Sequence, residues 1–228
     1  MNDECQADME AAFPPETYAP LVAAMKRAVL KANEHSKSAE FMRMPVGLDA
    51  RGYVRRAAIH AEIVEACEAG ELPFVARQIR MDKGFLHHTE IESGAFIAHP
   101  VRTESSFRFP EDSLSRQDAR LTNELDLFGD VVVPFKVLLG EVDKRYTWLT
   151  YGFAPDGSFT HICWAMPSPP GVEEWLAHID VLGRLKDLGA GVEDVQEAVP
   201  EPPPKPSLRF KENIEAALSK DKGDLGKS

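Results

Sequence analysis

Two histidines and one glutamate in the middle of the chain have the spacing of metal ligands on a hairpin. Residues 85–101 alternate in a way that predicts two short strands around the turn pair Ser93-Gly94. With that turn, His88 lies across the ladder from His99, and Glu90 points to the same face. Two imidazoles and one carboxylate are a ligand set for a divalent transition metal, with one coordination position left open.

The face assignment depends on the strand register. A slip of one residue would send these side chains to opposite faces of the hairpin. Polar residues on the solvent face of an antiparallel hairpin explain the same pattern without a ligand, and we favour that interpretation. We therefore assign no metal, no cofactor and no catalytic residue from the sequence.

A second pattern suits acidic nuclease chemistry. Charged residues flank the apolar run 131–139, and they include several carboxylates and a lysine. In some nucleases, carboxylates of this kind hold magnesium beside a lysine. That run contains Pro134-Phe135-Lys136 where a nuclease strand would carry Glu-x-Lys. We favour the interpretation that these charged residues belong to turns and caps. They are Asp126, Asp130, Glu141, Asp143 and Lys144.

Other catalytic signatures are missing from the sequence. It contains no Gly-x-Ser-x-Gly, no His-Glu-x-x-His and no Gly-x-x-x-x-Gly-Lys-Ser/Thr. His60-Ala-Glu62 matches half of a zinc deaminase signature, but the required Pro-Cys-x-x-Cys is absent. Gly189-Ala-Gly191 follows a predicted helix, so we interpret it as a helix terminator rather than a dinucleotide loop.

The clearest structural motif is a hairpin around Pro155-Asp156-Gly157. A three-residue loop there would pair Trp148 with Trp164 and Tyr146 with Met166 on one face, and the opposite face is also apolar. One face is expected to pack on helices. The other must be covered by another segment of the chain or by a partner. These four aromatic and apolar residues are our candidate binding residues on the sheet.

Composition bounds the class of protein. The chain has 228 residues, of which 43% are hydrophobic and 28% charged, so it can bury one sizeable core. No apolar run approaches a membrane span, and the acidic N-terminus is unlike a signal peptide, which predicts a cytoplasmic protein. Three cysteines without Cys-x-x-Cys spacing argue against disulfides and structural zinc.

The net charge of −11 opposes nucleic-acid binding. The charge is unevenly spread, because residues 22–83 hold 11 Lys and Arg against 8 Asp and Glu. Solvated helix faces are the favoured interpretation of this segment, and a phosphate-contacting face is the alternative.

Periodicity predicts an α+β fold: a mostly antiparallel sheet of about five or six strands, packed by N-terminal helices and one closing helix. Helical spacing predicts helices over residues 19–33, 54–69, 73–81 and 172–185, with a loop over residues 35–52. Strand patterns lie in the two hairpins and over residues 105–109 and 131–139.

We expect four regions along the chain. A flexible acidic N-terminus covers residues 1–14, and a single α+β domain covers residues 15–190. An acidic, proline-rich linker follows over residues 191–206. Residues 207–228 are expected to form a short amphipathic helix and tail, whose apolar stripe consists of Leu208, Ile214 and Leu218.

These features favour a non-catalytic, cytoplasmic protein-interaction or regulatory module. Its contact surfaces would be the aromatic sheet face and the tethered C-terminal helix, and its partner a protein or a second copy of the chain. Nucleic acid and membrane are not expected as partners. The alternative is a metal-dependent hydrolase or nuclease, which uses either the histidine–glutamate set or the carboxylates around residues 131–139.

Overall fold

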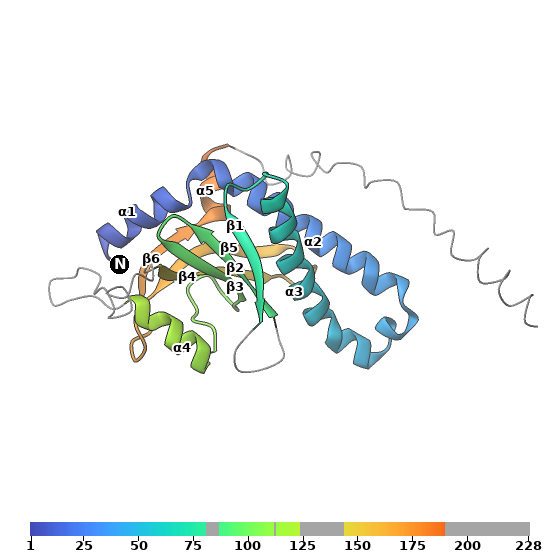
Figure 1. Cartoon of the computed structure of the whole chain (residues 1–228). Helices are drawn as coiled ribbons and strands as arrows, with labels where there is room; N and C mark the ends of the chain where they lie inside the picture. Colours follow the sequence, from blue (N-terminus) through green and yellow to red (C-terminus); the bar gives the residue numbers. More distant parts are fainter. Residues whose placement is uncertain (81–86, 112, 124–143, 190–228) are drawn as a thin grey trace, which may run out of the picture. The chain divides into compact units, whose positions relative to one another are not determined.

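The structure, a computed structural model, describes residues 1–80, 87–111, 113–123 and 144–189. Within this part of the chain, five α-helices and a six-stranded sheet form an α+β fold, which confirms the predicted fold class (Figure 1). All of these residues belong to one unit, Met1–Ala198, and the second unit, Val199–Ser228, lies outside the described residues. Among the described helices, none combines the length and the apolar character that crossing a membrane requires.

One sheet contains all six strands in chain order: β1 (Val75–Arg80), β2 (His87–Ser93), β3 (Phe96–Arg102), β4 (Arg145–Phe153), β5 (Phe159–Pro167) and β6 (Trp175–Asp180). Neighbouring strands are antiparallel except β3 and β4, which are parallel. A parallel pair needs a long return connection. Here the connection is residues 103–144, and it includes the helix α4 (Leu114–Arg120).

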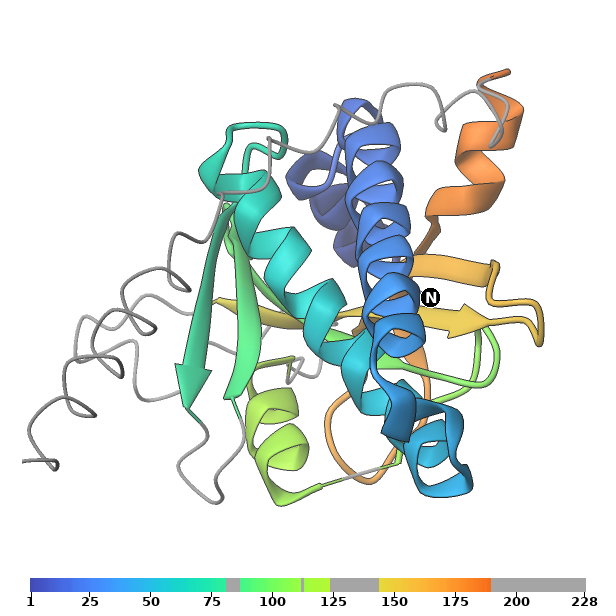
Figure 2. The same ribbon diagram turned by 90° about the vertical axis from the view of Figure 1, so that its right-hand side faces the viewer.

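The helices lie on both faces of the sheet. α2 (Tyr18–Ser38) and α3 (Pro45–Glu68) run side by side and cover one face, whereas α4 lies on the other (Figures 1 and 2). α1 (Asp3–Ala12) and α5 (Val181–Asp187) pack at the β5–β6 end. Single 3₁₀ turns join these elements: η1 (Pro15–Thr17), η2 (Glu40–Arg43) and η3 (Leu121–Asn123).

The sheet separates two apolar clusters. In the larger one, Leu149 and Trp164 of the sheet meet residues of the helices such as Met25 and Ile63. The smaller one, on the α4 face, consists of Val101, Tyr146 and Trp148, with Phe109, Ala119 and Trp175 packed against it. Both faces of the central strands are therefore covered by this chain.

The register of the second hairpin differs from the prediction. Phe153 pairs with Phe159 as expected, but a β-bulge next to this pair shifts the remaining ladder by one residue. Trp148 consequently pairs with Ala165, and the predicted Trp148–Trp164 pair is wrong. A one-residue shift exchanges the faces, so Tyr146 and Trp148 join the smaller cluster, and Trp164 and Met166 the larger.

Gly152 explains where the bulge forms. A Cβ atom at this position would overlap the side chains of Thr160 and His161, so only glycine fits. The His161 ring is buried there and contacts the Thr103 hydroxyl at 2.8 Å from Nε2. The sequence shows the glycine but not the side chain that approaches it.

Two predicted helices are wholly or partly strands. Residues 73–81 were expected to be helical, but Val75–Arg80 form the edge strand β1, whose backbone pairs with β2. Residues 172–185 were expected to form one helix, but Trp175–Asp180 form β6. Asp180 then caps α5 by accepting a hydrogen bond from the Gly183 amide, so the helix begins only at Val181. In both cases pairing with a neighbouring strand overrides helical spacing.

Other boundaries also change. The predicted loop over residues 35–52 is largely helical, since α2 extends to Ser38 and α3 begins at Pro45. Residues 105–109 form no strand, because the carbonyls of Ser106 and Phe107 accept hydrogen bonds from side chains of β6. The predicted strand over residues 131–139 lies outside the described residues.

The N-terminus was expected to be flexible over residues 1–14, but residues 3–12 form α1. The Asn2 side chain caps this helix by accepting from the amides of Glu4 and Cys5. Cys5, Met9 and Phe13 are spaced four residues apart and are all buried. The helix is therefore part of the core, despite its acidic surface. The predicted boundaries at residues 190 and 206 stay predictions.

Replacement of Phe13 tests whether α1 belongs to the fold. The Phe13 ring is fully buried and stacks on Trp164, with ring centroids 4.0 Å apart. We expect Phe13→Ala to lower the free energy of unfolding by about 3–5 kcal/mol in urea titrations. Phe41→Ala is the matched control, because that ring is 61% exposed, and it should cost less than about 0.5 kcal/mol. Equal unfolding midpoints for the two variants would show that α1 does not pack as described.

Candidate functional site

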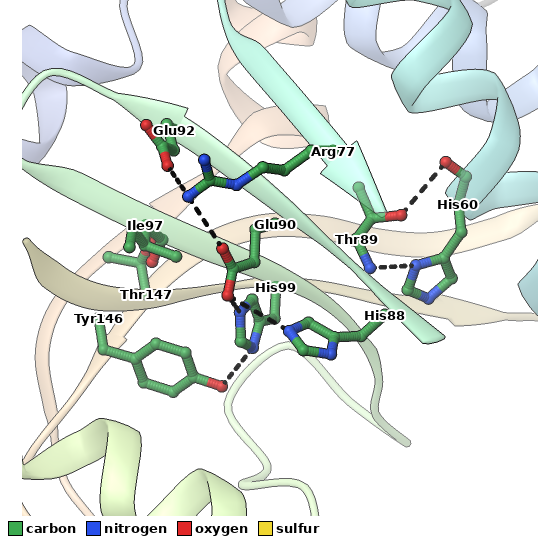
Figure 3. A network of polar contacts seen from close by, with 10 residues as sticks. All are labelled: His60, Arg77, His88, Thr89, Glu90, Glu92, Ile97, His99, Tyr146 and Thr147. Carbon is green, nitrogen blue, oxygen red and sulfur yellow. Dashed lines mark hydrogen bonds and ion pairs between the residues drawn. The ribbon is translucent and has the colours of Figure 1, made fainter. Parts of the chain in front are cut away.

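Polar side chains from three adjacent strands converge on the sheet face that α4 covers (Figure 3). β2 supplies His88 and Glu90, β3 supplies His99 and β4 supplies Tyr146. Successive strand side chains point to opposite faces, so Thr89, between the first two, points toward α3. Its amide donates to His60 Nδ1 at 3.1 Å, which ties β2 to α3.

The three metal-like ligands share a face although their predicted pairing is wrong. The turn is Gly94-Ala95, with Gly94 at φ +54° in the first position, as in a type II′ turn. In the resulting register, Ile91 pairs with Ala98. The next position along the ladder therefore places Glu90, rather than His88, opposite His99. The pairing differs from the prediction by two residues. An even shift keeps every side chain on its predicted face.

The distances in this cluster suit a metal better than hydrogen bonds. Glu90 Oε1 lies 3.4 Å from His88 Nε2 and 3.5 Å from His99 Nε2, both long for hydrogen bonds (Figure 3). Ligand atoms on a tetrahedral zinc ion, with bonds of about 2.0–2.1 Å, are about 3.4 Å apart. One ligand atom from each of the three residues lies within 4.8 Å of the other two.

Neighbouring groups orient two of the three ligands, His99 and Glu90. The Tyr146 hydroxyl lies 3.0 Å from His99 Nδ1, and Arg77 Nη2 lies 3.5 Å from Glu90 Oε2. With Nδ1–H as the donor to the Tyr146 oxygen, His99 Nε2 carries the lone pair that a metal needs. With the Tyr146 hydroxyl as the donor, His99 Nε2–H points to Glu90 Oε1 at 3.5 Å. Such orienting partners are typical of metal-ligating histidines.

The charge states also suit a cation. Contact with His99 holds the pKa of Glu90 at about 2, so this carboxyl group is ionised at neutral pH. Burial lowers the pKa of His99, which keeps the imidazole neutral. Metal ligands must be deprotonated in this way before they bind. Burial also raises the pKa of Tyr146 to about 12, so its hydroxyl stays protonated.

α4 is held over this cluster by two buried polar residues. Arg120 donates to the carbonyl oxygens of Ser168, Pro169 and Val172 at 2.7–2.9 Å. Asn123, in η3 directly after α4, bonds the backbone NH and carbonyl of Tyr146 at 2.8 and 2.7 Å. These bonds join the connection between β3 and β4 to the strand that carries the tyrosine. The position of α4 is thereby fixed.

A cavity of about 350 Å³ lies between α4 and the cluster. His88, Glu90 and His99 line it from the sheet, and Arg116 and Asp118 line it from α4. The three ligands therefore face space that can hold a water molecule and part of a substrate. A structural zinc site would instead use four protein ligands and leave no open position.

The other predicted site residues are not gathered here. Trp148, Trp164 and Met166 are buried within the chain, each no more than 1% exposed, and Tyr146 is 4% exposed. Their role in binding a partner stays a prediction. Leu208, Ile214 and Leu218 lie outside the described residues, as do Asp126, Asp130, Glu141 and Asp143. Lys144 is described, and it bonds Glu92.

The rejected His60-Ala-Glu62 pair is structural. Burial lowers the pKa of His60 to about 4, and the neutral ring accepts a hydrogen bond from Thr89. The Glu62 carboxylate pairs with Arg27, at 3.0 Å from Nε, and with Lys31. His60 Nδ1 and the Glu62 carboxylate therefore already have partners within the helices and strands.

Three residues that complete the site do not stand out in the sequence. The hairpin pattern predicts Tyr146 as a contact residue, and Arg116 and Asp118 lie in a polar, charged connection. Only the parallel pairing of β3 with β4 shows that this connection returns over the hairpin. The available signal was the length of residues 103–144, because a hairpin connection needs far fewer residues.

Comparison of the chain with protein-family models, curated proteins and solved structures finds no match in any of the three. The function is therefore inferred from the side chains and their geometry.

Proposed function

We propose that this protein is a divalent-metal-dependent hydrolase whose metal is held by His88, Glu90 and His99. The observation that carries the proposal is the convergence of three ligand atoms at metal-like spacing beside a cavity. Three protein ligands with an open fourth position are the pattern of catalytic zinc sites. The metal would lower the pKa of a bound water and polarise the bond that the water attacks.

Residues of α4 supply the remaining chemistry. Asp118 lines the cavity and is exposed, so it can take the proton of the attacking water as general base. Arg116 lines the same cavity and can bind the negative charge that develops on the substrate. Water is the only co-reactant that hydrolysis needs. The hydroxyl of the water bonds to the attacked atom, and the proton of the water goes to the leaving group.

The interaction-module prediction has less support from the described residues. Its four sheet residues are buried inside the chain, and its tail residues lie outside the described part. Exposed apolar side chains such as Phe41, Val46 and Tyr53 do occur in η2 and α3, but nothing in the structure shows what would cover them. A protein partner, self-association and a cytoplasmic location stay predictions.

Metal analysis tests the proposed ligands. We expect the chelator-stripped protein to bind one zinc per chain, and cobalt to give the visible absorption of a tetrahedral site. His99→Ala should abolish stoichiometric binding, and Tyr146→Phe should weaken it by about 10- to 100-fold, because the hydroxyl orients His99. His87→Ala is the matched control, since that neighbouring side chain is exposed and lines a different cavity.

If His99→Ala and His87→Ala change zinc binding equally, the proposed ligand set is contradicted. Circular dichroism of each variant checks that the fold is retained.

Hydrolysis of p-nitrophenyl phosphate and p-nitrophenyl acetate tests the reaction class. Zinc-dependent turnover is expected with one of these esters. Asp118→Asn should lower kcat by about 100-fold or more, as loss of a general base does, without changing zinc affinity. Turnover that persists in His99→Ala, or an unchanged kcat in Asp118→Asn, would oppose this mechanism.

A further inference from the structure

A second cavity, of about 430 Å³, adjoins the metal-like cluster and is lined by four arginines. Arg55 and Arg56 come from α3, Arg102 ends β3, and Arg116 comes from α4. Among the described residues that line this cavity, Asp49 is the only carboxylate. We call this group of arginines and its cavity the arginine cleft.

Among the described residues, Arg55, Arg102 and Arg116 contact an amide, a carbonyl group and an aromatic ring rather than carboxylates. Arg55 Nη2 donates to Asn33 Oδ1 at 3.3 Å, and Arg116 donates to the Glu111 carbonyl oxygen. Arg55 and Arg102 both stand over the Phe153 ring, at 5.5 and 5.9 Å from its centre. Within the described part of the chain, none of the four forms an ion pair, whereas Arg27, Arg77, Arg145 and Arg184 all do.

This arrangement costs stability unless an anion binds. The chain has a net charge of −11, so carboxylates are abundant elsewhere on it. Four like charges around one cavity repel each other, and a concave, partly apolar wall strengthens their field. Guanidinium groups match phosphate oxygens through paired hydrogen bonds, and several of them together suit a multiply charged group.

The arginine cleft adjoins the cavity at the metal-like cluster. The two share Arg56, Pro100, Val101 and Arg116 among their lining residues. The parallel pairing of β3 and β4 explains this, because the ends of both strands open at the same edge of the sheet. A ligand held by the arginines therefore lies beside the cavity that the three candidate metal ligands line.

We propose that the arginine cleft binds a phosphate or diphosphate group, so that the substrate is a phosphorylated compound whose reacting bond lies at His88, Glu90 and His99. The substrate assignment rests on the proposed hydrolase function, but binding of the anion does not. Tyr53, 74% exposed, and Phe153 place aromatic rings in the cleft beside the arginines. They give an organic part of the ligand a surface on which to stack.

Calorimetric titration of the full chain, stripped of metal by a chelator, tests the anion site. The probes are inorganic phosphate, pyrophosphate and malonate, at low ionic strength. We expect pyrophosphate to bind most tightly and malonate weakly. Arg102→Ala and Arg56→Ala should each weaken pyrophosphate binding by about 10- to 100-fold, the usual effect of losing a charged hydrogen-bond donor. Arg102→Lys serves as a second, milder variant and should weaken it less.

Arg43→Ala is the matched control, because it removes the same charge from an exposed arginine that lines none of these cavities. The anion site is refuted if pyrophosphate does not bind, if Arg43→Ala weakens it as much as Arg102→Ala, or if malonate binds more tightly. Arginine-dependent binding in a protein that fails to bind zinc would support the anion site and refute only the metal site.

Discussion

Parallel pairing of β3 with β4 is the constraint on which the site depends. Antiparallel neighbours can be joined by a short turn, but a parallel pair forces the chain to return across the sheet. The return carries α4 over the face where β2 and β3 place His88, Glu90 and His99. It also brings the ends of β3 and β4 to one edge, where Arg102 meets the arginines of α3. Without this pairing the three ligands would lie on the solvent face of a hairpin.

Two carboxylates of the protein show the difference between a structural and a functional arrangement. Glu62 is buried at the α2–α3 interface, and Arg27 and Lys31 neutralise it at short range. Glu90 is ionised as well, yet its close neighbours are two imidazoles at 3.4 and 3.5 Å and the edge of the Arg77 guanidinium. These contacts are longer than those of Glu62, and they leave the Glu90 carboxylate beside the cavity. A metal ion between Glu90 and the two imidazoles would replace them with bonds of about 2.0–2.2 Å.

Much of the fold follows from local sequence signals, but the site follows only in part. Alternation in residues 85–101 was enough to put the histidines and Glu90 on one face, because the pairing error was an even number of residues. The same reasoning failed at Trp148 and Trp164, where the bulge at Gly152 shifts the ladder by one residue and exchanges the faces. The short segment Val75–Arg80 is predicted as helix from Val75, Ala76 and Ile79, because so few apolar positions fit both periods and only strand pairing decides.

The arginine cleft cannot be predicted from the sequence, because its residues come together only through the sheet topology. An excess of basic residues over residues 22–83 suggests solvated helix faces or, less favoured, a phosphate-contacting face. The cleft joins Arg55 and Arg56 of that region to Arg102 and Arg116, which lie about fifty residues further along the chain. Charge counting along the sequence cannot detect residues that meet only through the sheet topology.

Anomalous diffraction from crystals grown with zinc tests the central claim most directly. Data collected on both sides of the zinc absorption edge should show one strong difference peak per chain, within bonding distance of His88 Nε2, Glu90 Oε1 and His99 Nε2. The peak should face the cavity under α4, with a non-protein ligand in the fourth position. A fully occupied zinc at other residues, with these three side chains unbound, would contradict the account.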